Sequence, residues 1–463
     1  MTTTKQQQKH IYMTETPIHR LIIRLAIPAI ISMLISSIYN MADTFFIGQL
    51  KDGSAAATSA TAAVGVAFPL MSIIQAVGFM FGHGSGNFIS RALGSQKTEE
   101  AGRMAATGFF SALLAGVLLS VIGLVLLEPL CRLLGSTDTI LPYAMNYIRI
   151  ILIGAPWMCA SLVLNNQLRF QGNAFFSMIG ISTGGVINIA LDPLFIFTFH
   201  MGISGAALAT IISQFISFVL LFIATRKSDN LNIHIRNFTP KKHYFQEIFK
   251  GGAPSLFRQG IGSVSTTCLN NIAKAVVDLS IADPTIAALS IVSRIMMFAN
   301  SLVIGFGQGF QPVCGFNYGA GKHSRVREAF YFCVKLGTCV LIAAAIAGLC
   351  FAPSIISLFR ADDAQVIEIG ALALRLQCIT MPLFAYVVLS NMMLQTIAKT
   401  FRASLLAIAR QGLFFLPILL VLAYTSGLFG IQLTQPIADV FSFLLALILM
   451  RKTMQEINVP ESP

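Results

Sequence analysis

Long, mostly apolar segments recur along this chain, and they constrain its fold more than any other feature. About twelve of them reach the roughly 20 residues that a helix needs to cross a bilayer. They cover residues 21–49, 60–90, 105–127, 143–166, 176–198, 203–225, 251–277, 285–314, 329–352, 366–396, 402–424 and 431–450. Lipid offers backbone groups no hydrogen-bond partner, so a crossing segment must be a helix or part of a closed barrel. In barrel strands, apolar and polar residues alternate along the chain. These segments lack that alternation, which favours helices.

The composition excludes a soluble globular protein. The chain is 55% hydrophobic and only 11% charged, whereas soluble domains carry about 25% charged residues. One soluble core does not grow large enough to bury that much apolar sequence, but a bilayer can cover apolar side chains from outside. We therefore predict an all-α polytopic membrane protein of twelve transmembrane helices, with the lipid bilayer as its constant partner.

The positive charges lie between the apolar segments rather than in one patch. A net charge of +12 could suggest a nucleic acid partner, but Lys and Arg gather in the N-terminus, the even-numbered loops and the C-terminal tail. This alternation is how positive charges fix the topology of a membrane protein. We therefore expect no nucleic acid partner and place both termini in the cytoplasm. The polar N-terminus has no cleavage-site pattern, so we expect no removable signal peptide.

The two halves of the chain repeat each other at a near-constant offset. Matching residues lie 226 or 227 positions apart: Pro28 and Pro254, Gly78 and Gly305, Gly82 and Gly309, Pro156 and Pro382, Asn165 and Asn391. Six spans per half bring both halves in from the same side of the membrane, as in transporters built from parallel repeats. We predict two pseudo-symmetric six-helix lobes, residues 1–225 and 248–463, joined by a polar cytoplasmic linker of residues 226–247.

Several segments, taken in order, resemble the multidrug and toxic compound extrusion (MATE) family. They are IYNMADTFFIG at 38–48, Gly94 with the charged segment after it, NIALDP at 188–193 and GAALAT at 205–210. The resemblance extends over about residues 15–452. It implies export of organic cations or amphipathic drugs from a bacterium across its inner membrane, driven by inward movement of protons or sodium ions. We expect a monomer that uses no cofactor other than this coupling ion.

Three carboxylates lie inside apolar spans, namely Asp43, Asp192 and Asp439. Ionisable groups are costly in a membrane and indicate functional sites by default. Asn188 precedes Asp192 by four residues and so shares its helix face, and Thr210 lies deep in the next span. Pro193 removes a backbone donor near Asp192. Together these residues predict a cluster of oxygen atoms in the N-terminal lobe.

Such a cluster suits two kinds of coupling ion. Oxygen ligands bind hard cations, so Asp43 and Asp192 are predicted metal ligands if the ion is sodium. Burial also favours the protonated form of a carboxyl group, so the same cluster suits a proton. The resemblance to the MATE family implies that the ion site consists of Asp43, Asn188, Asp192 and Thr210, which match the family's ion-binding positions. The alternative is that the two carboxylates only hold helices together, with Arg24, Arg91 or Arg149 as partners.

The second half does not duplicate these carboxylates, because Leu269 and Ile418 stand at the matching positions. Asp439 follows Pro436 and either caps a helix or lines the cavity between the lobes. Aromatic faces bind cations, and Met side chains adapt to varied partners. The residues predicted to line the substrate cavity are Tyr39, Asn40, Met71, Gln75, Met178, Met297, Asn391 and Asp439.

The predicted function is secondary active multidrug efflux by alternating access, in antiport with protons or sodium ions. A dedicated metabolite exporter is one alternative. Another is a lipid-linked oligosaccharide flippase, which would need several cationic residues in its central cavity, and the N-terminal half offers few. An enzyme would need clustered His, Asp or Glu on several facing spans. Only two or three acidic residues lie inside the spans, so we expect no enzymatic activity. His83 lies in the middle of a span and is interpreted as a packed polar side chain rather than a ligand.

Overall fold

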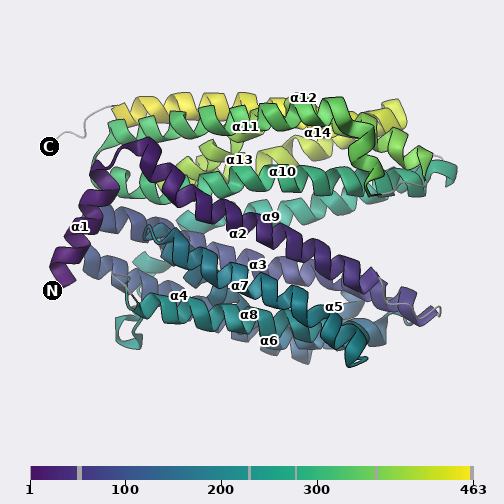
Figure 1. Cartoon of the computed structure of the whole chain (residues 1–463), viewed down its shortest axis with the longest axis horizontal. Helices are drawn as coiled ribbons and strands as arrows, with labels where there is room; N and C mark the ends of the chain where they lie inside the picture. The colour runs from purple at the N-terminus through teal and green to yellow at the C-terminus, as the bar shows by residue number, and fades with distance from the viewer. Residues whose placement is uncertain (1, 49–54, 228–230, 277–278, 360–362, 459–463) are drawn as a thin grey trace.

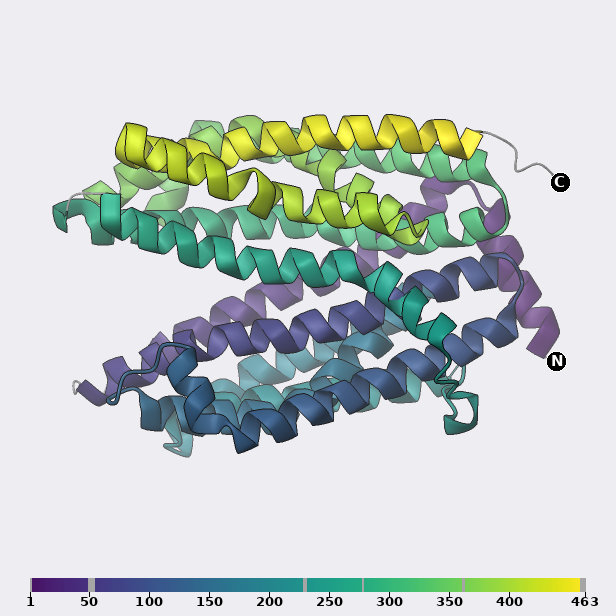
Figure 2. The ribbon, with the colours of Figure 1, turned by 180° about the vertical axis from the view of Figure 1, so that it is seen from behind.

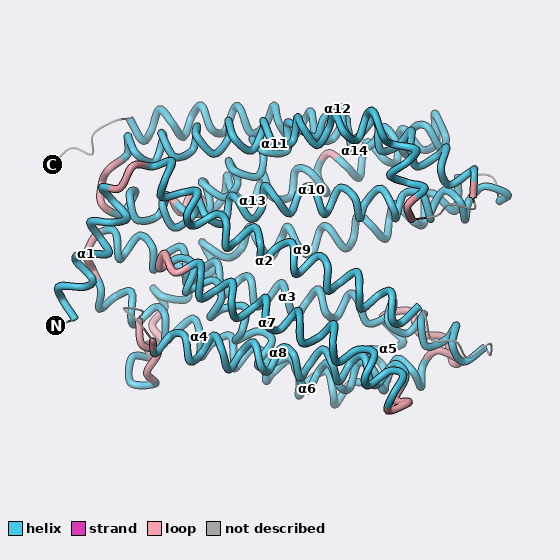
Figure 3. Tube along the Cα trace, in the orientation of Figure 1, coloured by secondary structure: helices cyan, strands magenta, loops and turns pink. Residues whose placement is uncertain are grey.

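The structure is a computed structural model that describes residues 2–48, 55–227, 231–276, 279–359 and 363–458. All the regular secondary structure in these ranges is helical (Figures 1 and 3), which confirms the all-α prediction. The first half contains α1 (Thr2–Glu15), α2 (Ile18–Gly48), α3 (Ala55–Gly94), α4 (Thr98–Val125), α5 (Leu127–Leu133), α6 (Leu141–Phe170), α7 (Ala174–Pro193), the π-helical turn η1 (Leu194–Thr198) and α8 (Gly202–Arg226). The second contains the short 3₁₀ helix η2 (Ile235–Asn237), α9 (Lys242–Val276), α10 (Leu279–Gly319), α11 (His323–Ser357), α12 (Ala364–Thr396), α13 (Thr400–Ile408), the π-helical turn η3 (Ala409–Leu413) and α14 (Phe415–Asn458).

Ten described segments are long and apolar enough to cross a membrane. One of them, Thr400–Ile457, has 58 residues, and its chain reverses at Gly427, where φ is 56° and ψ is −133° (Figure 2). This segment therefore crosses twice. Helix α9, with 35 residues, is too polar to be among the ten, yet it packs along α3 inside the molecule. With these two additions, the twelve predicted spans are all present.

The spans form two bundles, the two predicted lobes. One contains α2, α3, α4, α6, α7 and α8, and the other contains α9 to α14 (Figures 1 and 2). The bundles meet at the end of the molecule that holds both termini, and their ribbons diverge towards the opposite end (Figure 2). Helix α2 packs against α10, and α3 packs against α9. The contact between the lobes is therefore made mainly by the first two spans of each.

The polar segment between the lobes is held against the N-terminal lobe. The backbone N–H of Leu231 donates to Oε1 of Gln171 at 2.8 Å. Thr107 Oγ1 in α4 accepts from the backbone N–H of Thr239 at 3.1 Å. Helix α9 begins at Lys242, within the segment of residues 226–247 that the sequence suggests as a linker.

Glycine residues allow the close approach of the two lobes. A Cβ atom added to Gly84 would overlap the carbonyl oxygen of Ile248 in α9, and one added to Gly252 would overlap that of Met80 in α3. On the other side of the contact, a Cβ on Gly309 would lie 2.6 Å from Cα of Ala26 in α2. Small residues at helix contacts let backbones approach in lipid. Close packing across the lobes therefore explains much of the glycine content of α3 and α10.

The internal repeat appears in hydrogen bonds as well as in sequence. Asn165 Nδ2, near the end of α6, donates to the carbonyl oxygen of Ser177 in α7 at 3.1 Å. Asn391 Nδ2, near the end of α12, donates to that of Ala403 in α13 at 2.6 Å. Each asparagine reaches twelve residues ahead into the first turns of the next helix. The repeat therefore preserves a connection that fixes consecutive helices within each lobe.

Replacing Gly84 with Ala is expected to destabilise the protein, because the new Cβ must push α3 away from α9. Overpacking of this kind costs about 1–3 kcal/mol, so the thermal unfolding midpoint of the purified protein should fall. Gly260→Ala in α9 is the matched control, since open space surrounds that position, and its midpoint should not fall. Equal midpoints for both variants would contradict close packing of the lobes at Gly84.

Candidate functional site

Two carboxylates of the N-terminal lobe form the centre of the candidate site. Asp43 projects from α2, and Asp192 lies near the end of α7 with no exposed surface. The two carboxylates are close enough to interact electrostatically. Asn188 Nδ2 lies 3.4 Å from Oδ1 of Asp192, so the predicted pairing on one helix face is confirmed by the geometry.

One oxygen of each carboxylate has no hydrogen-bond partner in the described part of the chain. Oδ1 of Asp43 and Oδ2 of Asp192 are buried and have no hydrogen-bond partner among the described residues. Neither carboxylate forms an ion pair within that part of the chain. Of the arginines considered as partners, Arg91 pairs with Glu247 at 3.1 Å. Unpaired buried carboxylates are costly, so this arrangement favours a role in binding a cation over a role in holding helices together.

The backbone near Asp192 changes its helical geometry. Helix α7 continues through Pro193, which has no N–H for the carbonyl of Ile189, and then passes into the π-helical turn η1. Single π-helical turns occur frequently at functional sites. The local sequence thus supplies a backbone oxygen without its helical partner one turn before Asp192.

Thr210, the fourth residue of the predicted ion site, lies in α8 and is 8% exposed. Its hydroxyl group donates to the carbonyl oxygen of Ala206 at 3.0 Å, within its own helix. The lone pairs of that hydroxyl oxygen remain able to accept a hydrogen bond or to bind a cation. Helix α8 packs against α7 and η1, so Thr210 lies on a helix next to the one that carries Asp192.

Tyr147 is a residue of this site that the sequence analysis did not find. It lies in α6 with no exposed surface and interacts electrostatically with both Asp43 and Asp192. Its hydroxyl group lies 4.0 Å from Sδ of Met71, a predicted cavity residue. No sequence signal marked Tyr147, because one aromatic residue in an apolar span is ordinary. Only the packing of α6 against α3 and α2 against α7 brings it to the carboxylates.

The other predicted cavity residues are dispersed over the molecule. The ring of Tyr39 packs against Gly185 of α7, less than one turn from Asn188. Gln75 Oε1 in α3 accepts from Nε2 of Gln259 in α9 at 3.3 Å, a contact between the lobes. The remaining positions are Met178, half-buried in α7, Met297, 46% exposed in α10, Asn391, 5% exposed and bonded to α13, and Asn40, whose side chain lies outside the described part of the structure.

Asp439 is engaged within the C-terminal lobe. One of its carboxylate oxygens accepts from Nε of Arg410 at 2.7 Å and from Nε2 of Gln435 at 2.8 Å. The guanidinium of Arg410 also lies over the ring of Phe384, with Cζ 4.4 Å from its centroid. Unlike Asp43 and Asp192, this carboxylate is fully compensated. Its geometry is that of a buried ion pair joining η3 to α14.

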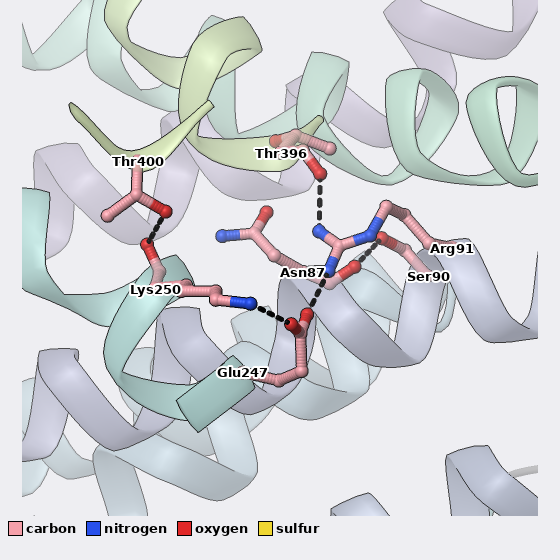
Figure 4. A network of polar contacts seen from close by, with 7 residues as sticks. All are labelled: Asn87, Ser90, Arg91, Glu247, Lys250, Thr396 and Thr400. Atoms are coloured by element: carbon pink, nitrogen blue, oxygen red, sulfur yellow. Dashed lines mark hydrogen bonds and ion pairs between the residues drawn. The ribbon is translucent and has the colours of Figure 1, made fainter. Parts of the chain in front are cut away.

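A polar network joins the lobes at the end that holds the termini (Figure 4). Arg91 Nη1 of α3 donates to the carbonyl oxygen of Thr396 at 2.6 Å, and its Nη2 pairs with Glu247 of α9 at 3.1 Å. Glu247 also pairs with Lys250 at 3.1 Å. The side chains of Arg91 and Glu247 are each only 15% exposed. Arg91 therefore bridges the N-terminal lobe to two helices of the C-terminal lobe.

Comparison with known proteins agrees with this architecture. The MatE family model matches residues 28–194 and 260–421, one segment in each half of the chain. The chain belongs to the MATE family. The resemblance found in its sequence is thereby confirmed, and the assignment as a multi-pass transporter follows from it.

The relatives of this MATE family member include a multidrug export protein. The multidrug export protein MepA of Staphylococcus haemolyticus (strain JCSC1435) is 27% identical over 457 residues, covering 97% of each chain. A MATE crystal structure in complex with MaD3S has a TM-score of 0.89 and 25% identity, covering 96% of this chain and 98% of that one. A multidrug resistance MATE family transporter in an outward-facing conformation shares the fold, with a TM-score of 0.89 and 24% identity over 96% and 98% of the two chains.

Replacing Asp439 with Asn is expected to destabilise this MATE protein, whereas Asp192→Asn should not. The first change leaves Arg410 without its counter-charge, and breaking a buried ion pair costs about 3–5 kcal/mol. The second removes a buried negative charge that has no basic partner within the described ranges. Thermal unfolding of the purified variants measures both effects. A larger loss for Asp192→Asn would mean that its carboxylate holds the fold together.

Proposed function

We propose that this protein is a secondary active exporter of organic cations and amphipathic drugs, driven by inward movement of protons or sodium ions. The observation that carries the proposal is the pair of buried carboxylates, Asp43 and Asp192, without a basic partner among the described residues. Their only direct neighbour in hydrogen-bond range there is the neutral amide of Asn188. The relationship to a multidrug export protein supports the choice of substrate class.

The proposed coupling follows from electrostatics. Two carboxylates in a poorly solvated site attract a cation strongly, and that cation is either the coupling ion or a positively charged substrate. Entry of a proton or sodium ion neutralises the pair and weakens the hold on the substrate. Release of the ion on the other side restores the charge. An ion drives such a cycle only if it binds one conformation more tightly than the other.

The proposed cycle alternates access between the two faces of the membrane. The lobes meet at the end that holds both termini and diverge at the other (Figure 2). Lys97, Lys322 and Lys399 lie near the same end as the termini, and positive charges favour the cytoplasmic side. We therefore assign that end to the cytoplasm of a bacterium and this conformer to an outward-facing state. A monomer contains both lobes and suffices for the cycle.

Ethidium transport into everted membrane vesicles, the direction that corresponds to efflux from cells, tests the proposed function. We expect efflux under a proton gradient alone or a sodium gradient alone, and that result would also name the ion. Asp192→Asn should reduce the driven rate at least about tenfold, since it removes a charge needed for coupling. Asp138→Asn is the matched control, because the Asp138 side chain is 88% exposed and pairs with Arg132 far from the site. Absence of efflux under both gradients would contradict the proposal.

Loss of the Arg91–Glu247 pair is expected to favour separation of the lobes at the end with the termini. If the pair contributes about 1 kcal/mol, Glu247→Gln should raise the ratio of open to closed conformers about fivefold. Pulsed electron paramagnetic resonance measures the distance between the lobes, with spin labels at Glu100 in α4 and Phe401 in α13. The labels are introduced in a cysteine-free background that retains ethidium efflux. The matched control is Glu99→Gln, whose pair with Arg103 lies within α4. A distance distribution unchanged by Glu247→Gln would exclude this pair as a latch.

A further inference from the structure

Two arginines lie together at the boundary between the lobes, and neither pairs with an acidic side chain in the part of the chain that the structure describes. Arg169, near the end of α6, is only 2% exposed, and Arg258 is half-buried in α9. Their guanidinium groups are close enough to interact electrostatically. Among the described residues neither forms an ion pair, and the guanidinium of Arg258 makes no hydrogen bond there. Like charges in a poorly solvated place are unfavourable, so this pair requires an explanation.

The side chains within hydrogen-bond range of Arg169 are all neutral. Its Nη2 lies 2.7 Å from Oδ1 of Asn166, 3.3 Å from Nε2 of His83 and 3.5 Å from Oε1 of Gln311. A guanidinium can only donate, so Nε2 of His83 accepts, and the proton of this ring belongs on Nδ1. Nδ1 then donates to Oγ of Ser255 in α9 at 3.1 Å. His83 therefore holds Arg169 in position and supplies no negative charge.

The cluster has more hydrogen-bond donors than acceptors. Nε of Arg169 and Nε2 of Gln311 are buried and have no partner within the described residues, and the guanidinium of Arg258 adds further donors. Gln311 has no exposed surface. Buried polar groups without partners are rare in native structures. An acceptor-rich group of negative charge would satisfy these donors and compensate both guanidinium groups.

The cluster spans the boundary at which the lobes must separate. His83 and Arg169 belong to the N-terminal lobe, whereas Arg258 and Gln311 belong to the C-terminal lobe. Gln395, which occupies the position of Arg169 in the second repeat, donates to Ser255 at 2.8 Å. Opening of the lobes towards the termini would break the contact between Arg169 and Gln311. The basic groups would then face a molecule that enters between the lobes.

We propose that Arg169, Arg258 and the Gln311 amide form a binding site for an oxyanion, a carboxylate or a phosphate, carried by the transported molecule. Guanidinium groups bind both through two parallel hydrogen bonds. This inference rests on the proposed function and refines its substrate class. The carboxylates Asp43 and Asp192 bind a positive group, and the arginine cluster binds a negative one. Molecules that carry both a positive and a negative group are then bound more tightly than purely cationic ones.

Two dyes that differ only at one carboxyl group test the proposal. Tetramethylrhodamine carries a free carboxylate, and its methyl ester lacks that charge while keeping the same cation. We expect the wild-type protein to export both. Arg258→Gln should slow export of the acid about tenfold and change export of the ester less than twofold. Arg258→Lys, which keeps the charge but not the paired donors, should lie between. Arg149→Gln is the matched control, because Arg149 is exposed on α6, and it should affect neither dye.

Binding to the purified protein separates this inference from the function on which it rests. Fluorescence anisotropy should show the Kd of the acid rising about tenfold in Arg258→Gln and Arg169→Gln, with the ester unchanged. This readout needs no gradient, so it tests the oxyanion site even if efflux of ethidium and both dyes is absent. Equal effects on acid and ester, or none on either, would overturn the proposal.

A lipid phosphate is the other source of an oxyanion. Native mass spectrometry of the protein purified from membranes that contain phosphatidylglycerol distinguishes the two. Loss of bound phosphatidylglycerol in Arg258→Gln, with unchanged affinity for the acid dye, would assign the cluster to a lipid headgroup and overturn its role in substrate binding. Equal lipid retention by the wild type and the variant, with weaker binding of the acid dye, supports the proposal.

Discussion

Backbone hydrogen bonds must close within each crossing segment, and the rest of this structure depends on that constraint. Lipid offers N–H and C=O groups no partner, so every described span is a helix. Helices with satisfied backbones associate in lipid through packing rather than through a hydrophobic driving force. The close contacts of Gly84 with Ile248 and of Gly309 with Ala26 are therefore among those that hold the lobes together.

Charges inside the membrane fall into two classes, compensated and uncompensated. Asp439 with Arg410, and Arg91 with Glu247, are paired across helices and stabilise the arrangement in which they occur. The carboxylates in the N-terminal lobe and the arginine cluster between the lobes have no counter-charges among the described residues. Burial of unpaired charge is unfavourable without a ligand, which is why we propose these two places as the binding sites for the coupling ion and the substrate.

The position of each charged group relates it to a different step of the proposed cycle. Asp43 and Asp192 lie within one lobe, so a bound ion can change their charge without separating the lobes. The Arg91 network and the Arg169 cluster each include residues of both lobes, so any movement of the lobes alters them. Coupling between ion binding and movement of the lobes requires only one thing. The charge within the N-terminal lobe must change the relative energy of the inward-facing and outward-facing arrangements.

The sequence by itself determined the helices, their number, the repeat and the family, because these depend on local hydropathy, residue spacing and ordered motifs. It also singled out Asp43, Asn188 and Asp192, since a carboxylate in an apolar segment stands out and i to i+4 spacing sets a shared face. It could not distinguish Asp192 from Asp439, because the partner Arg410 lies 29 residues away on another element. Tyr147 and the pairing of Arg169 with Arg258 were invisible for the same reason. Only the tertiary structure decided which charges are compensated, because compensation depends on distances between helices that sequence order does not encode.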